Sequence, residues 1–439
     1  MTATQQYFVA VIGAGPAGLF GARELANKGA RVLLLNRDIK PGGLAEYGIY
    51  PNKYTMKGGL RKQFRQILDL PNIDYYGNVV VGSQGDLTLD DLRALGVQAI
   101  LVTVGAQGTK WLGLPGEDLE GVYHAKDVVY YYNHLPPFSQ KTFRFGKRCA
   151  VIGAGNVMLD ITHYLTRERK VDEVIAVVRR GPAEVKFDKK EMEYVIANLD
   201  FVALDAEIQR VTPVMQAVHQ DPAAAKATIL EALPKALPRE SDTRFRFEFL
   251  ASPVRMIGDE DGKLKQVELE DNILVEANGD TKARSTGNKR LLDVETVIFA
   301  IGDKVDDTFG LPIEWNEFIK NTNPRFPIDG ISYEAPADDV FVGGWSRQAS
   351  TGLVGYARKD GTNASKAVWQ YLQTKAPVDL EPKAVTEKLK SLNKPVVTKE
   401  DIKKLEAVEV AEAEKRGMEE FKFDTNDDML QAIGLTETV

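Results

Sequence analysis

The chain has 439 residues, of which 44% are apolar and 27% charged, a composition typical of folded proteins and a length sufficient for two or three domains. Its 56 Lys and Arg residues against 63 Asp and Glu residues give a net charge of -7, which argues against a protein that coats nucleic acid. The single cysteine, Cys149, excludes an internal disulfide and a four-cysteine iron–sulfur site, and the scattered histidines give little support to a metal site.

The N-terminal residues lead directly into an apolar segment. No basic leader or cleavage site precedes the apolar run that begins at Tyr7. No stretch reaches the ~18–20 apolar residues that a membrane helix needs. With one cysteine in the whole chain, we expect a soluble protein of the cytoplasm.

The first predicted unit runs from Tyr7 to Asp38, YFVAVIGAGPAGLFGARELANKGARVLLLNRD. A buried strand, a glycine turn, an amphipathic helix and a second buried strand follow one another, as in a βαβ unit. Gly13, Gly15 and Gly18 form GxGxxG between strand and helix. The first glycine permits the tight turn, the second lets a pyrophosphate approach the backbone, and the third lets helix and strand pack closely. We therefore predict a dinucleotide site, with the phosphates at the helix N-terminus.

The second strand of this unit ends in Asn36, where such sites usually carry an acid for the ribose hydroxyls. An amide can also hydrogen-bond a hydroxyl, without the charge assistance of a carboxylate. Asp38 lies two residues further on and could substitute. The sequence leaves both residues open as the ribose contact.

A second unit of the same kind runs from Arg148 to Gly181, RCAVIGAGNVMLDITHYLTRERKVDEVIAVVRRG. Its glycine loop begins at Gly153 and lacks the third glycine. Its second strand ends in Arg179 and Arg180, where an NAD site would place an acid. Two guanidinium groups suit a 2′-phosphate by charge and by geometry, although two solvated arginines at a strand end are the plainer alternative.

Two buried strands that each end in a glycine turn, VQAILVTVGAQ at 97–107 and VETVIFAIGDKVDD at 294–307, predict the crossings between two domains. The predicted fold class is α/β, with two Rossmann-type dinucleotide-binding domains, one inserted into the other. We expect a discontinuous first domain of residues 1–108 and 302–375, a second domain of residues 109–301, and a charged C-terminal extension of residues 376–439. In that extension, KEDIKKLEAVEVAEAEKRG predicts a solvated helix.

Four motifs together resemble the adrenodoxin reductase family of ferredoxin–NADP reductases. They are VVRRGPAEVKFDKKEME, GAGNVMLD, AILVTVGAQGTKWLGLPGEDLEGVYHAKDVVYYYNHLPP and VFVGGWSRQASTGLVGYARKDG. The resemblance covers nearly all of residues 7–375. The stretch PGGLAEYGIYPNK is closer to the flavin-binding small subunit of glutamate synthase, a relative in the same superfamily. That relative has a cysteine-rich iron–sulfur domain, which a chain with one cysteine cannot form.

The resemblance implies FAD in the first domain and NADP in the second. Carried over position by position, the family's FAD contacts fall on Ala17, Asn36, Leu44, Val81, Trp345, Gly352, Leu353 and Val354. Its NADP contacts fall on Ala154, Gly155, Asn156, Val157, Arg179, Arg180, Glu191 and Gly352.

Two further positions are candidate catalytic residues by the same resemblance. Asp160 matches a family acid near the reacting rings, and a local hydrogen bond within its helix is the alternative role. Where the family has a histidine after the turn that follows the FAD strand, this chain has Asn52 and Lys53. We expect Lys53 to tune the flavin by its charge and not to carry a proton.

The resemblance implies an enzyme in which hydride passes from NADPH to FAD and electrons pass singly to ferredoxin or another small carrier, or in the reverse direction. Docking of an acidic ferredoxin would need a local positive surface, for which we considered Arg239, Arg244, Arg246 and Arg255. Two alternatives remain at this stage: the NADPH-oxidising flavin subunit of a larger reductase, and a nucleotide-binding protein without turnover.

Overall fold

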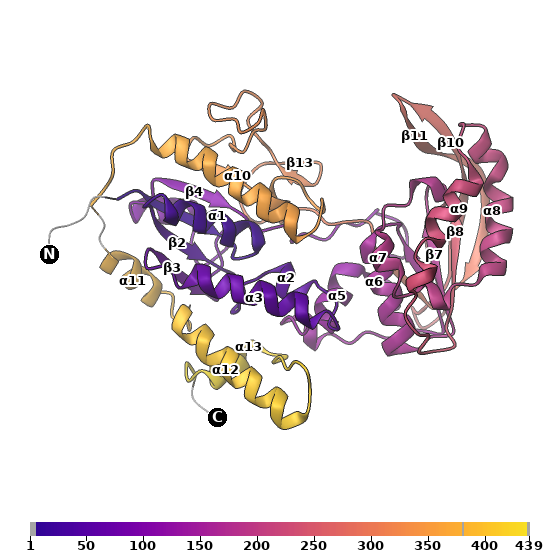
Figure 1. Ribbon diagram of the computed structural model, residues 1–439, viewed down its shortest axis with the longest axis horizontal. Helices are drawn as coiled ribbons and strands as arrows, with labels where there is room; N and C mark the ends of the chain where they lie inside the picture. The colour runs from indigo at the N-terminus through magenta and orange to yellow at the C-terminus, as the bar shows by residue number, and fades with distance from the viewer. Residues whose placement is uncertain (1–5, 380–381, 437–439) are drawn as a thin grey trace. The chain divides into compact units, whose positions relative to one another are not determined.

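The computed structural model describes residues 6–379 and 382–436 and divides into two compact units (Figure 1). The first unit comprises residues 1–109, 130–140 and 302–439, as far as they are described, and the second comprises residues 110–129 and 141–301. The predicted α/β class with two parallel sheets is confirmed. Residues 130–140, expected in the second domain, lie in the first unit, as does the C-terminal segment expected to form an extension. The expectation about the leader concerns residues 1–5, outside the described residues.

The first unit is built around a sheet with the strand order β15-β4-β1-β2-β3-β16. Its parallel strands are β1 (Phe8–Ile12), β2 (Arg31–Leu35), β3 (Ile73–Gly77), β4 (Ala99–Val102) and β15 (Val340–Val342), and the antiparallel edge strand is β16 (Val397–Thr398). Along β1, Val9 and Val11 enter one core cluster while Ala10 and Ile12 enter another on the opposite face. Both faces are buried, which explains why these strands read as continuous apolar runs.

Helices cover this sheet, and in Figure 1 α10 lies along α1. The helices of the unit are α1 (Pro16–Asn27), α2 (Leu44–Tyr47), α3 (Tyr54–Leu68), α4 (Leu89–Ala94), the end of α5 (Ala125–Tyr132), η1 (Phe138–Gln140), η6 (Gly344–Ser346), α10 (Val354–Leu372), α11 (Pro382–Lys390), α12 (Lys399–Arg416) and α13 (Asn426–Ala432). A short hairpin joins β13 (Ile313–Glu314) to β14 (Glu317–Phe318). The close contact of α1 and α10 depends on Gly361, where a Cβ atom would lie 2.1 Å from the carbonyl oxygen of Ala17.

The C-terminal segment is an integral part of the first unit. The predicted helix is present as α12, but the expectation that it is solvated is wrong for one face. Ile402 and Leu405 are buried in the same core cluster as Val9, and β16 extends the sheet through its pairing with β3. The misprediction has a physical cause: the buried face of this helix contains acids as well as apolar residues, which weakens the periodic signal. The buried Glu409 pairs with Lys40 from a distant segment.

The second unit, all of which is described, contains a parallel sheet in the order β5-β12-β6-β7-β8 and a three-stranded antiparallel sheet. The parallel strands are β5 (Val122–His124), β6 (Arg148–Ile152), β7 (Glu173–Val178), β8 (Arg244–Phe249) and β12 (Thr296–Phe299), and the antiparallel strands are β9 (Ala251–Gly258), β10 (Leu264–Ala277) and β11 (Asp280–Asp293).

Helices and short helical turns connect these strands. They are the start of α5, α6 (Asn156–Tyr164), η2 (Leu165–Arg169), η3 (Pro182–Glu184), α7 (Lys189–Met192), η4 (Ile196–Asn198), α8 (Phe201–Gln216), α9 (Pro222–Leu230) and η5 (Leu233–Lys235). No helix in the described part of the whole chain is both long and apolar enough to cross a membrane.

Candidate cofactor-binding sites

The first glycine loop connects β1 to α1 at the carboxyl end of the central strand. Gly13 has φ +99°, and a Cβ atom there would lie 2.5 Å from the carbonyl oxygen of Thr103, which directly follows the neighbouring strand β4. A Cβ atom on Gly18 would lie 1.8 Å from the carbonyl oxygen of Gly13, so helix and loop can approach this closely only with glycine. Gly15 has only the Cα atom of Gly43 within 4.0 Å of such an atom, which leaves its backbone approachable.

Both glycine loops end in helix N-termini that no side chain satisfies. Neither α1 nor α6 has a side-chain cap or an acid in its first turn. Thr88, Asp200 and Thr398 cap α4, α8 and α12, whereas α3 and α10 also lack a side-chain cap and an acid, without a glycine loop of this kind before them. The first N–H groups of a helix have no partner within the helix, and the helix dipole makes that end positive. With open glycine backbones beside them, these two ends fit the pyrophosphates of FAD and NADP.

The side chain of Asn36 braces the first loop from within. Its Oδ1 atom accepts a hydrogen bond from the backbone N–H of Ala14 at 3.0 Å, and its Nδ2 atom donates to the carbonyl oxygens of Asp38 and Lys40 at 2.8 and 3.0 Å. It is 6% exposed. Both amide protons are therefore engaged with the protein's own backbone, leaving only the acceptor oxygen for a ribose hydroxyl. The carboxylate of Asp38 pairs with Arg37 at 3.0 Å.

Several further FAD candidates gather around the same loop. Leu44 begins α2 directly after Gly43, whose own hypothetical Cβ atom would lie 3.1 Å from the Cα atom of Gly15. Trp345 lies in η6. A Cβ atom on the neighbouring Gly344 would lie 2.7 Å from the Cβ atom of Ala17, so this turn packs closely against the start of α1. The contacts bring segments from three distant parts of the chain to one edge of the sheet.

The remaining first-unit candidates border this region. The indole Nε1 atom of Trp345 donates to the carbonyl oxygen of Thr351 at 2.9 Å, immediately before Gly352. Gly352 has φ +73°, Leu353 is exposed, and Val354 begins α10. Val81 is buried. Two residues before it, the backbone N–H of Val79 donates a hydrogen bond to the backbone carbonyl oxygen of Asn36.

Sequence reasoning missed an ion pair that holds the turn bearing Trp345. The buried carboxylate of Asp360 accepts from the backbone N–H of Gly344 at 2.6 Å and pairs with Arg347 at 2.7 Å. Tyr333 donates its hydroxyl to the same carboxylate at 3.2 Å. Gly344, Arg347 and Asp360 all lie in the motif VFVGGWSRQASTGLVGYARKDG, but the sequence does not show that they contact one another.

The two candidate catalytic residues lie in different units, Lys53 just before a helix and Asp160 on one. Lys53 is the half-buried residue that precedes α3, and its backbone N–H donates to the carbonyl oxygen of Tyr50 at 3.1 Å. Asp160 is half-buried in the second turn of α6, the helix that follows the second glycine loop.

The second glycine loop is held by residues 186–188, which belong to the motif VVRRGPAEVKFDKKEME but were assigned no role from the sequence. Ala154 accepts from the backbone N–H of Lys186 at 2.9 Å, and the side chains of Asn156 and Asp188 hydrogen-bond at 2.7 Å. A Cβ atom on Gly155 would meet nothing within 4 Å, and the side chain of Val157 is 41% exposed. The backbone of this loop is therefore open to a ligand.

The two arginines after β7 have different surroundings. β6 and β7 pair in parallel, which places Arg179 and Arg180 at the same sheet edge as the second glycine loop. Arg180 is half-buried, donates to the carbonyl oxygen of Thr281 at 3.3 Å and lies 3.7 Å from Asp280. Arg179 is exposed, and its guanidinium makes no hydrogen bond or ion pair with any described residue. Glu191 follows on α7, half-buried.

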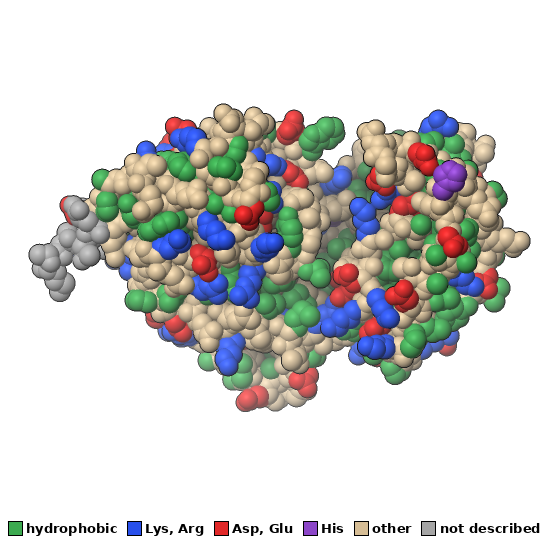
Figure 2. Space-filling model, turned by 45° about the horizontal axis from the view of Figure 1, so that its top comes forward, with side chains coloured by type: hydrophobic (Ala, Val, Ile, Leu, Met, Phe, Trp, Pro, Cys, Tyr) green, Lys and Arg blue, Asp and Glu red, His purple; other side chains and the backbone are tan. Residues whose placement is uncertain are grey.

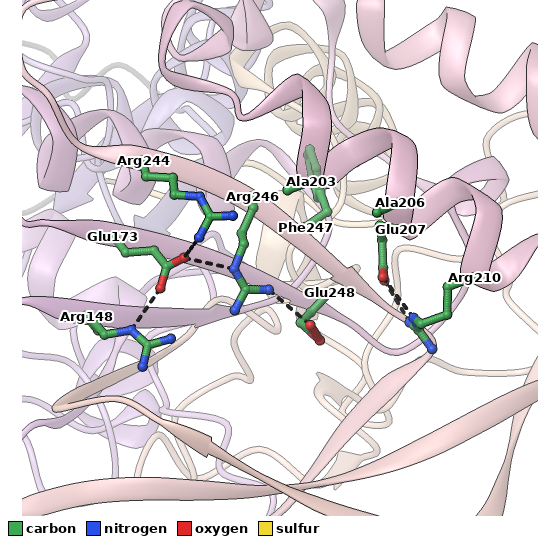
Figure 3. Close-up of a pocket in the computed structure, with 10 residues that line it drawn as sticks. All are labelled: Arg148, Glu173, Ala203, Ala206, Glu207, Arg210, Arg244, Arg246, Phe247 and Glu248. Carbon is green, nitrogen blue, oxygen red and sulfur yellow. Dashed lines mark hydrogen bonds and ion pairs between the residues drawn. The ribbon is translucent and has the colours of Figure 1, made fainter.

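The arginines considered for carrier docking are all ion-paired. Arg244 and Arg246 both contact Glu173 at 2.9 Å, in a pocket of about 410 Å³ (Figure 3). Arg239 faces Asp242 at 3.7 Å and Arg255 faces Glu268 at 3.3 Å. On the face drawn in Figure 2, basic and acidic side chains are interspersed. These four arginines do not form a surface of one sign.

The comparisons with known proteins agree with this arrangement. Residues 7–333 match the model of the pyridine nucleotide-disulphide oxidoreductase family. The chain is 30% identical over 388 residues to the NADPH-ferredoxin reductase FprA of Mycobacterium tuberculosis, covering 81% of each chain. It is 29% identical to the mitochondrial NADPH:adrenodoxin oxidoreductase of Arabidopsis thaliana, covering 79% of this chain and 78% of that one. The solved structure of Mycobacterium tuberculosis FprA in complex with NADPH superposes with a TM-score of 0.82 at 26% identity, over 98% of this chain and 100% of that one.

Proposed function

Because this chain belongs to the pyridine nucleotide-disulphide oxidoreductase family, among relatives that are NADPH-ferredoxin and adrenodoxin reductases, we infer that it is an NADPH-dependent flavoprotein reductase. It transfers electrons from NADPH through FAD to ferredoxin or a similar one-electron carrier, or in the reverse direction. The observation that carries this function is the pair of glycine loops, each opening on a helix N-terminus without a cap or an acid.

FAD binds to the first unit in this proposal. The uncapped N-terminus of α1 receives the pyrophosphate, while Leu44, Trp345 and the start of α10 at Val354 surround the rest of the cofactor. When bound, FAD supplies the redox chemistry, since it can accept a hydride and release single electrons. The chain's own residues bind and orient it, and Lys53 supplies a positive charge.

NADP binds to the second unit. The N-terminus of α6 takes its pyrophosphate, and Arg179 has a free guanidinium for the 2′-phosphate. Arg180 contributes less, since it already donates to the β10–β11 hairpin. Asp160, on the helix that follows the loop, is proposed to act near the nicotinamide, as the family resemblance implies.

Disulfide chemistry, which the family name includes, is not part of this proposal. An internal redox disulfide needs two thiols, and Cys149 is the single cysteine of the chain. Cys149 is fully buried in the second unit, on β6. The acceptor is therefore a carrier that takes electrons from the flavin directly.

We also propose a reducing compartment, the cytoplasm, as the location. The support is the use of one buried thiol in 439 residues. Relatives named as adrenodoxin oxidoreductases are mitochondrial by name, so fractionation of the source cells decides between the two compartments.

The test of the proposed function is a steady-state assay of the purified protein. We expect a yellow protein whose FAD is released by denaturation, and NADPH-dependent reduction of cytochrome c that requires an added ferredoxin. Flavodoxin and quinones serve as comparison acceptors. A colourless protein that binds nucleotides without turnover would favour the non-catalytic alternative instead.

A further inference from the structure

Seven charged side chains, five of them buried and two half-buried, form a cluster where the C-terminal segment meets the region after β2. Four are basic and three are acidic: Lys40, Lys57, Arg61, Lys422, Glu46, Glu409 and Glu420. Glu46 is 3% exposed and Lys57 is 1% exposed. Ions this deeply buried are stable only when each is paired, so the two chain segments depend on each other.

One side of the cluster leads to the first glycine loop. Glu409, on α12, accepts a hydrogen bond from the Nζ atom of Lys40 at 2.5 Å. The carbonyl oxygen of Lys40 accepts from the Nδ2 atom of Asn36, whose Oδ1 atom accepts from the backbone N–H of Ala14. Gly42 also donates its N–H to the carbonyl oxygen of Ala14, at 2.7 Å. A continuous buried path thus connects α12 to the loop that faces the FAD pyrophosphate.

The other side of the cluster leads to α2. Lys422 donates to the backbone carbonyl oxygen of Glu46 at 2.8 Å, near the C-terminal end of that short helix, and its Nζ atom lies 3.3 Å from the carboxylate of Glu46. Arg61 binds the same carboxylate at 2.6 Å. Because Leu44 starts α2, its position is set from both sides by residues of α3 and of the C-terminal segment.

We propose that residues 399–424 are part of the flavin site, and that Glu409 and Lys422 are positioning residues that hold the first glycine loop and α2 in the geometry that binds FAD. This rests on the proposed function, because it assumes that the first unit binds FAD. It adds that the C-terminal segment determines the affinity for the flavin and the environment of its ring system.

The experiment compares three variants of the full-length chain. Glu409→Gln keeps the shape of the side chain and removes its charge. Lys422→Met removes the positive charge and the hydrogen bond that Lys422 donates to the carbonyl oxygen of Glu46. Glu412→Gln is the matched control, because Glu412 lies on the same helix and, among the residues that the structure describes, pairs only with the nearby Lys415 and Arg416. The readouts are FAD affinity of the apoprotein, NADP affinity, the shape of the flavin absorption bands, and amide hydrogen exchange over residues 36–48.

We expect the two cluster variants to bind FAD about 10- to 100-fold more weakly than the control, which is the effect of losing one charged hydrogen bond. NADP affinity stays at the control value, exchange over residues 36–48 accelerates, and the flavin bands of the saturated variants change shape. Equal FAD affinity in all three variants would overturn the inference. A parallel loss of FAD and NADP affinity would also overturn it, because it would indicate general unfolding. A parent protein without affinity for FAD would overturn the proposed function, and this inference with it.

Discussion

The hydrogen bonds of the Asn36 side chain could not be predicted from its position in the sequence. Its place at the end of a strand in a dinucleotide unit predicts a ribose contact. In the structure its amide protons are directed to the carbonyl oxygens of Asp38 and Lys40, and its oxygen to Ala14. An amide can brace backbone on both sides because it both donates and accepts, which a carboxylate cannot do. The place of Asn36 at the end of the second strand was predictable from the sequence. The backbone groups to which its side chain hydrogen-bonds were not.

Arg179 and Arg180 should contribute unequally to cofactor choice. Arg179 is exposed without a partner among the described residues, whereas Arg180 already donates to Thr281. A charge-assisted contact of about 1.5–3 kcal/mol corresponds to roughly a 10- to 100-fold change in affinity. We expect Arg179→Ala to lower kcat/KM for NADPH by that factor, with Arg180→Ala having a smaller effect and NADH efficiency nearly unchanged in both. Equal use of NADPH and NADH by the parent protein would refute the assignment.

Lys53 should act on the flavin through its charge. A positive charge near the ring favours the reduced, negatively charged form, so Lys53→Met is expected to lower the flavin potential while turnover of NADPH remains measurable. Spectroelectrochemical titration measures the potential, and Lys53→Arg, which keeps the charge, is the control. An unchanged potential in Lys53→Met, or a complete loss of hydride transfer, would show that the residue has another role.

Cys149 should be unreactive in the folded protein. It is fully buried, and burial raises the pKa of its thiol to about 12. The nucleophilic thiolate is therefore scarce at neutral pH, and because the folded pKa lies above the ordinary value, it becomes appreciable only as the pH approaches 12. We expect no alkylation by iodoacetamide at pH 8 until the chain is unfolded, and full alkylation afterwards. Rapid labelling of the native protein would mean that β6 opens readily.

At the scale of elements, the two βαβ units were predictable because local signals agree. Buried parallel strands such as β1 and β6 give uninterrupted apolar runs, and glycines mark where the helix begins. The burial of α12 was not predictable, because its buried face contains acids as well as apolar side chains and therefore gives no clear periodic pattern. The pairing of residues 186–188 with the second glycine loop likewise depends on the tertiary fold.

The glycines of the two loops should respond differently to substitution by alanine. A Cβ atom on Gly18 would lie 1.8 Å from backbone, whereas on Gly155 it would meet nothing within 4 Å. Gly18→Ala should destabilise the protein by about 1–3 kcal/mol or more and cost FAD affinity. Gly155→Ala should leave the thermal midpoint unchanged and weaken NADP binding, because the added methyl group lies where the pyrophosphate approaches the backbone. Thermal unfolding and NADP titration of both variants check this, and intact NADP affinity in Gly155→Ala would contradict it.

At the scale of the whole molecule, the chain is a discontinuous two-unit reductase in which the C-terminal segment belongs to the first unit. The return of the chain to the first unit near Gly302 was predictable from a second buried strand ending in a glycine turn. The contribution of residues 130–140 and of the C-terminal segment to that unit was not, since it depends on contacts over long sequence separations such as Lys40 with Glu409. These contacts also connect the charged C-terminal segment to the candidate flavin site.

The most direct test of the central claim is an anaerobic titration of the FAD-loaded parent protein with NADPH, followed by oxidised ferredoxin. We expect about one equivalent of NADPH to bleach the flavin band, because one hydride carries two electrons. We expect NADH to do so far less efficiently, and about two equivalents of a one-electron ferredoxin to restore the colour. A flavin that NADPH does not bleach, or a reduced flavin that ferredoxin cannot reoxidise, would contradict the central claim.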